Sequence, residues 1–136
     1  MFLTRLSERE KELFMELATA VVKADGKVDN AELISLNYYA MEMGVNFEFE
    51  KTAGNVDDIL AELKASSSDE IKRVFVLELL ALAFADKEYV DAEESLMKKI
   101  CDALGIENAS YYKSLYMVID YLSDLNKMGQ FIEKGI

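Results

Sequence analysis

The stretch that decides the fold is the apolar run Val74-Phe75-Val76-Leu77-Glu78-Leu79-Leu80-Ala81-Leu82-Ala83-Phe84-Ala85. A helix over residues 69–85 would be apolar on almost every side, which is typical of a helix that other helices surround. We therefore predict a central helix over 69–85 with Leu79 and Leu82 in the core. Glu78 is the one charged residue in the run. Because an unpaired buried carboxylate is costly, Glu78 is expected either to reach solvent or to find a partner, such as a cation or amide donors.

Helix start and stop signals recur on both sides of this run. A start signal here is an oxygen-bearing N-cap residue with a glutamate three positions later. The chain has four of them: Ser7 with Glu10, Asp29 with Glu32, Ser67 with Glu70, and Asp91 with Glu94. Gly44 and Gly105 are matching stop signals, because glycine readily takes the left-handed conformation that ends a helix.

These signals predict helices over 8–23, 30–43, 56–64, 69–85, 92–104 and 109–126, with Asn55 as a further cap. The stretch 45–52 has room for one short turn of helix. The 136 residues contain no proline, which favours long helices. We therefore predict an all-α fold, a compact bundle of about six to seven helices. Residues 1–126 would form a single domain and 127–136 a loosely ordered tail.

The charge and composition exclude several classes of function. Acids outnumber bases by 26 to 15, giving a formal net charge of −11, so the domain should repel nucleic acid and anionic lipid. Histidine is absent, which removes the usual general base and the commonest transition-metal ligand. Cys101 is the only cysteine, and we interpret it as a buried apolar residue. No signal peptide is visible and the apolar run is too short to span a bilayer, so we predict a cytoplasmic location without membrane insertion.

The sequence repeats itself at a distance of about 61 residues. Phe14, Ala20, Val21, Ala24 and Asp25 align with Phe75, Ala81, Leu82, Ala85 and Asp86. In each half the helix enters an acidic loop and a second helix follows, ending at glycine. With Asp29 matched to Asp91, the second loop is one residue longer and its following helix one residue shorter. The repeat predicts two pseudo-symmetric helix–loop–helix halves that bury their apolar faces against each other.

The acidic residues of the two loops can be interpreted in two ways. The first is structural: Asp29 and Asp91 are good N-caps, and Glu32 and Glu94 suit the positive end of a helix dipole. The second is a ligand site, which would explain why Asp25 and Asp86 stand at helix C-termini, where an acid opposes the dipole. An EF-hand is excluded, because Val21 and Lys23 fall on leading ligand positions and Lys87 replaces the required glycine.

At these loops the chain resembles a known family. Ala24-Asp25-Gly26-Lys27-Val28-Asp29-Asn30-Ala31-Glu32 and Phe84-Ala85-Asp86-Lys87-Glu88-Tyr89-Val90-Asp91-Ala92-Glu93-Glu94 are similar to the paired signature of the TerB-like (tellurite-resistance) domain. The resemblance extends roughly from Leu6 to Asp124. It implies about seven helices, an acidic surface proposed to chelate divalent metal, and no catalysis. It also implies association with metal- or stress-response systems at the cytoplasmic face of the bacterial membrane.

Taken together, these features predict a non-enzymatic binding or scaffold module. The candidate ligands of a divalent cation are Asp25, Asp29, Glu32, Asp86, Asp91 and Glu94. The alternative is a protein–protein interaction module whose acidic face docks a basic partner without metal. An enzyme is the least favoured class, because no nucleophile–base constellation or phosphate loop is present.

Overall fold

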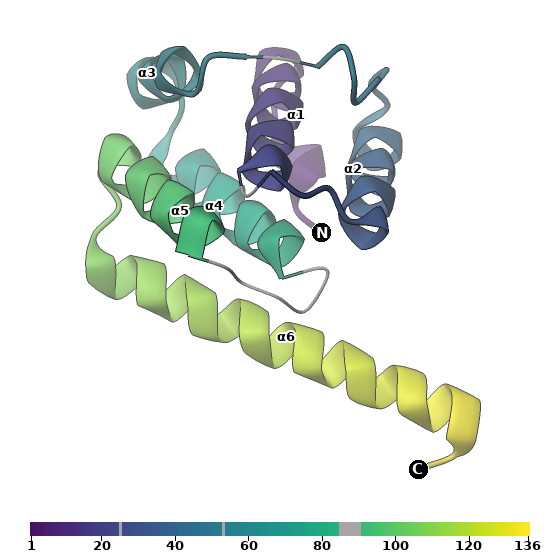
Figure 1. Ribbon diagram of the computed structural model, residues 1–136. Helices are drawn as coiled ribbons and strands as arrows, with labels where there is room; N and C mark the ends of the chain where they lie inside the picture. The colour runs from purple at the N-terminus through teal and green to yellow at the C-terminus, as the bar shows by residue number, and fades with distance from the viewer. Residues whose placement is uncertain (25, 53, 85–90) are drawn as a thin grey trace.

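The computed structural model describes residues 1–24, 26–52, 54–84 and 91–136. A short 3₁₀ helix, η1 (Leu3–Arg5), precedes six α-helices: α1 (Glu8–Lys23), α2 (Asn30–Met43), α3 (Val56–Ser66), α4 (Asp69–Ala83), α5 (Asp91–Leu104) and α6 (Asn108–Lys134). No strand occurs in these ranges. The predicted all-α class is thus confirmed. In Figure 1 the long α6 lies along one side of the other helices and extends past them at its C-terminal end.

Local signals account for most of the helix boundaries. α1 and α2 have the predicted bounds, and each begins with a complete capping box, Ser7 with Glu10 and Asp29 with Glu32. Gly44 ends α2 in the left-handed conformation, with φ of 68°. The stretch 45–52 contains no helix; it makes one turn, in which the N–H of Thr52 donates to the carbonyl of Glu48 (2.9 Å).

The predicted end of the last helix near Asn126 is wrong. α6 continues to Lys134 and ends at Gly135, which is left-handed with φ of 71°. Gly129 lies inside the helix and weakens it without ending it, because one glycine costs only about 1 kcal/mol relative to alanine. Residues 127–134 are therefore helical and the side chains along this stretch are largely exposed. Whether they are held loosely stays a prediction.

The core forms where α1 and α4 meet. The rings of Phe14 on α1 and Phe75 on α4 pack edge to face with centroids 5.4 Å apart, and both residues are fully buried. Leu79 and Leu82 are also fully buried, as predicted. The expectation that the central helix is the most buried one is only partly right, because α1 has as many buried residues as α4. The two helices share the centre of the bundle.

The two halves of the molecule are equivalent at a constant offset of 61 residues. The buried positions of α1 are Leu13, Phe14, Met15, Leu17, Ala18, Thr19, Val21 and Val22, and those of α4 are Val74, Phe75, Val76, Glu78, Leu79, Leu80, Leu82 and Ala83. Every member of the first set lies 61 residues before a member of the second. The same holds for Glu32, Leu36, Ala40 and Met43 of α2 against Glu93, Met97, Cys101 and Leu104 of α5. The predicted pseudo-symmetric halves thus share one burial pattern.

This constant offset corrects two predicted positions. The N-cap of α4 is Ser68, which lies 61 residues after Ser7, and its hydroxyl accepts from the N–H of Ile71. The predicted cap Ser67 instead ends α3, and its hydroxyl donates to Glu10 Oε2 (2.6 Å). Asp91 is the first residue of α5, and the glutamate equivalent to Glu32 is Glu93 rather than Glu94. Neighbouring polar residues are interchangeable as caps, and the phase of each helix against the core distinguishes them.

Candidate functional site

The acidic residues of the first half serve local helix geometry. Asp29 is exposed and its carboxylate accepts from the N–H of Ala31 (2.7 Å). The backbone N–H of Asp29 in turn donates to Glu32 Oε1 (3.3 Å), and Glu32 is buried. Both carboxylates lie in the first turn of α2, where the helix dipole favours negative charge. Helix capping therefore explains the positions of these two residues without a bound ligand.

The described acidic residues at the start of α5 have three different surroundings. Asp91 is exposed at the start of α5. Glu94 is partly exposed and pairs with Lys98 Nζ one turn later (3.1 Å). Glu93 is buried, at 1% exposure, and occupies the place of Glu32 in the repeat. Sequence analysis missed Glu93, although the 61-residue offset of Phe14 and Phe75 would have identified it.

The predicted cation site is not assembled by these residues alone. Asp25 and Asp86 lie outside the described residues. Within the described ranges, no group of three or more His, Cys, Asp or Glu side chains is arranged to hold a metal ion. Asp29, Glu32, Asp91 and Glu94 therefore do not by themselves form a chelating cluster. The six-residue site stays a prediction that depends on Asp25 and Asp86.

Glu78 is the carboxylate most deeply buried in the bundle. Its Oε1 accepts from the N–H of Phe2 (2.8 Å) and lies 3.1 Å from the ammonium group of Met1. Its Oε2 is buried and has no hydrogen-bond partner in the described part of the chain. The expectation that Glu78 finds a partner is thus confirmed. This pairing holds the N-terminal segment against α4.

The surroundings of Glu78 shift the pKa of two neighbouring groups. Burial lowers the pKa of the Met1 ammonium, but Glu78 and Glu42 raise it, and the net pKa lies above its ordinary value. Glu42 Oε1 lies 3.1 Å from the same ammonium. Burial, with Glu78 nearby, also raises the pKa of Tyr39, whose hydroxyl donates to the carbonyl of Glu78 (3.4 Å). The ammonium and the phenol therefore both stay protonated at neutral pH.

Replacing Glu78 with leucine is expected to lower the free energy of unfolding by no more than about 1–2 kcal/mol, because it removes the acceptor of the Phe2 N–H but also removes a costly buried charge. Leu17 occupies the equivalent place in α1 and is fully buried, so the other half of the repeat accommodates a leucine at this position. The Met1 ammonium, which is partly exposed, keeps Glu42 as a partner. Glu78→Ala should instead cost about 2–5 kcal/mol, because it leaves a cavity. Urea unfolding measures both, and a loss as large for leucine as for alanine would contradict this account.

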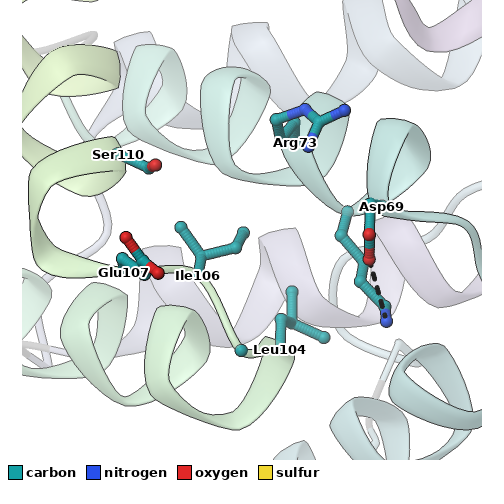
Figure 2. A pocket seen from close by; sticks show the side chains of 8 residues that line it. Asp69, Arg73, Leu104, Ile106, Glu107 and Ser110 are labelled. Atoms are coloured by element: carbon teal, nitrogen blue, oxygen red, sulfur yellow. Dashed lines mark ion pairs between the residues drawn. The ribbon is translucent and has the colours of Figure 1, made fainter.

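One pocket lies where the start of α4 meets the connection between α5 and α6 (Figure 2). It has a volume of about 210 Å³ and is lined by both charge signs, with Lys72 and Arg73 beside Asp69 and Glu107. Lys72 Nζ lies 3.8 Å from Asp69. Small-molecule sites usually occupy roughly 300–1,000 Å³ and are mostly apolar. The pocket therefore gives no indication of a substrate site.

Cys101 is buried, and burial raises the pKa of its thiol to about 11. The thiol is therefore protonated at neutral pH and is a poor nucleophile. This agrees with its interpretation as a small apolar core residue. It occupies the position of Ala40 in the repeat, where a small side chain is likewise buried.

The fold and the acidic helix starts define a class: an acidic all-α domain built from two similar halves. The chain belongs to the TerB family, because the family model described as "Tellurite resistance protein TerB" matches residues 40–114, more than half of the chain. The match includes α3, α4, α5 and the second acidic motif, whereas the first motif precedes it. Searches among curated proteins and among solved structures found no match. Among the described residues, no helix is both long and apolar enough to cross a membrane.

Proposed function

We propose that this TerB-family chain is a non-enzymatic binding module of a bacterial metal- or stress-response system, which docks a basic surface of another protein. The observation that supports this most is the surplus of carboxylates. If each of the 15 lysines and arginines paired with an acid, 11 acids would still lack a cationic partner. A basic partner would relieve their mutual repulsion and be attracted from a distance.

The face we propose for docking contains two exposed acids of the two acidic motifs, Asp29 and Asp91. Neither has an ion pair with a lysine or arginine within the described residues. Lys98 and Lys99 lie about two turns further along α5, and they pair with Glu94 and Asp57. Among the described residues, the lysines nearest in sequence to Asp91 are therefore already engaged, which supports an external cation as its partner.

The competing candidate is the divalent cation site. It is favoured by the burial of Glu32 and Glu93 at equivalent positions, each one helical turn after an acidic loop. It requires Asp25 and Asp86 in addition, since the described acids form no chelating cluster. A cation site predicts that divalent ions raise the melting temperature specifically, whereas a docking module predicts no specific rise. One series of melting experiments therefore separates the two candidates.

For a docking module, Ca²⁺, Mg²⁺, Mn²⁺ and Zn²⁺ should shift the melting temperature no more than monovalent salt of the same ionic strength. Both would act by screening the net charge of −11. A specific cation at about 100 times its dissociation constant would instead add roughly 2.7 kcal/mol. That corresponds to about 8–16 °C for a domain of this size. A divalent-specific shift that Asp25→Asn with Asp86→Asn abolishes would replace the docking proposal with the cation site.

A lysine-rich peptide serves as the probe of docking itself. Asp29→Asn with Asp91→Asn should weaken its binding by about 3–10-fold, since each exposed ion pair contributes up to about 1 kcal/mol. Asparagine caps helices as well as aspartate does, so α2 should keep its start. Asp120→Asn with Asp124→Asn removes the same charge from α6 and should change binding less than about twofold. Titration calorimetry at fixed salt compares the variants, and equal weakening by both pairs would show that the peptide does not select the proposed face.

A further inference from the structure

α2 has an apolar stripe on the face opposite its buried side. Ile34, Tyr38 and Met41 follow one another at helical spacing and are 56%, 66% and 75% exposed. We call these three residues the α2 stripe. Figure 1 shows α2 at one edge of the bundle. Single apolar residues on a surface are ordinary, whereas a contiguous apolar patch is typical of an interaction site.

The internal repeat shows that the fold does not require the α2 stripe. The equivalent positions of α5, 61 residues later, are Ser95, Lys99 and Asp102, and all three are exposed. The two helices share their buried positions, so the same arrangement is built with a polar outer face in one half and an apolar outer face in the other. Packing within the chain therefore does not explain the α2 stripe, which indicates a contact with another molecule.

A groove continues the α2 stripe around the helix. It has a volume of about 410 Å³ and is lined by Leu33 and Asn37 of α2 and by residues 47–51, which follow α2. Asn37 adjoins Ile34 and Met41 on the helix surface, because it lies three positions after one and four before the other. Both phenylalanines of residues 47–51 are half-buried. The α2 stripe and this groove therefore form one continuous surface that is largely apolar.

The charge around this surface favours a basic partner. Residues 28–50, which include α2 and most of the groove wall, contain five acids and no lysine or arginine, and no other stretch of the chain without a base is as long. Asp29 is exposed at the start of α2. Glu50 is exposed in the groove and has no ion pair with a lysine or arginine among the described residues, and the adjacent Lys51 pairs with Glu48 (3.0 Å).

The same charge disfavours two other occupants. A second copy of this chain would place the five acids of residues 28–50 against the same five acids of its partner. Anionic lipid would be repelled in the same way. A partner with lysines or arginines beside its apolar residues would instead relieve the repulsion among these acids while it covers the α2 stripe.

We propose that the α2 stripe and the groove bind a basic amphipathic helix of another protein. Side chains in a row on one helix pack between those of a second helix, and recognition of a helix in a groove uses apolar anchors at this spacing. The partner's apolar side chains would contact the α2 stripe and enter the groove, and its cations would meet Asp29 and Glu50. The inference rests on the proposed docking function and adds to it an apolar surface and the amphipathic character of the partner.

Two synthetic peptides of leucine and lysine test the proposal with the full chain. Both have the same composition and about 14 residues, enough to span roughly 21 Å as a helix and to cover the α2 stripe. One peptide places its leucines on a single helical face, and the other spreads them around the helix. The one-faced peptide should bind at least about tenfold more tightly in titration calorimetry at fixed salt, because only it presents a continuous apolar surface.

Ile34→Ser with Met41→Ser should weaken binding of the one-faced peptide by about tenfold or more, because it removes apolar contact area without changing the net charge. Met128→Ser with Ile132→Ser is the matched control: it removes the same two residue types from exposed positions on α6 and should change binding less than about twofold. All four positions are exposed, so both variants should melt close to the wild type. Met41→Ser alone, at the most exposed position of the α2 stripe, tests the surface if the pair lowers the melting temperature.

A second pair of variants tests the charge. Glu50→Gln should weaken binding of the one-faced peptide by about 2–5-fold, since an exposed ion pair contributes up to about 1 kcal/mol. Glu133→Gln removes the same charge from an exposed position of α6 and should leave binding nearly unchanged. Equal effects of these two substitutions would mean that only the net charge attracts the peptide, and would overturn the role of the groove.

The outcomes separate this inference from the proposed function. Equal binding of the two peptides, or equal effects of the two serine pairs, would overturn the inference. The docking function would survive that result if Asp29→Asn with Asp91→Asn still weakened both peptides, whereas binding of neither peptide would overturn both proposals. A mass that rises towards two chains in sedimentation equilibrium, and that Ile34→Ser with Met41→Ser keeps at one chain, would assign the α2 stripe to a second copy instead.

Discussion

Phe75→Ala is expected to lower the free energy of unfolding by about 3–5 kcal/mol. The Phe75 ring is fully buried and packs edge to face on Phe14, its equivalent in the other half. Alanine would leave a cavity between α1 and α4, the two helices that share the core. Phe14→Ala should cost a similar amount, because its ring also contacts Tyr39, with centroids 5.6 Å apart.

The pair also predicts coupling between the two halves. In a double-mutant cycle, the loss for the double variant should be smaller than the sum of the single losses by about 0.5–1.5 kcal/mol, the usual contribution of an aromatic pair. Urea unfolding of the four proteins measures this coupling. Strictly additive losses would mean that the halves do not meet through these two rings.

Leu79→Ala is expected to cost about 2–5 kcal/mol, through lost burial and the cavity it leaves. Leu79 is fully buried on α4, the helix that contacts α1, α2, α5 and α6. Leu125→Ala is the matched control, since Leu125 is a partly exposed leucine on the overhanging end of α6. The control should change stability by less than about 0.5 kcal/mol. A small effect at Leu79, or equal effects at both positions, would contradict the assignment of α4 to the centre.

The exposed acidic residues of the two motifs suit a partner of opposite charge, whose attraction weakens as salt rises. Measuring the binding of a lysine-rich peptide over a range of ionic strength would therefore show how much of that binding is electrostatic.

Local sequence by itself determined which segments are helical and where most helices begin. Ser7, Asp29 and Asn55 satisfy backbone N–H groups a few residues away, so their effect can be predicted without knowledge of the fold. The glycine stops at Gly44 and Gly105 are local in the same way, since both take positive φ. The family resemblance also rested on short contiguous motifs, and the family match confirms it.

Only the tertiary structure decided which of two adjacent polar residues is buried. Glu93 and Glu94 are chemically equal as first-turn acids, but Glu93 faces the core while Glu94 reaches Lys98. Ser67 and Ser68 can both cap a helix, and the packing of α4 against α1 fixes the helix phase that selects Ser68. The partners of the buried Glu78 carboxylate are Phe2 and Met1, which lie more than 70 residues away in sequence. Capping acts over a few residues, whereas burial depends on contacts between distant segments, and this is why the sequence determined the helices and the fold determined their buried acids.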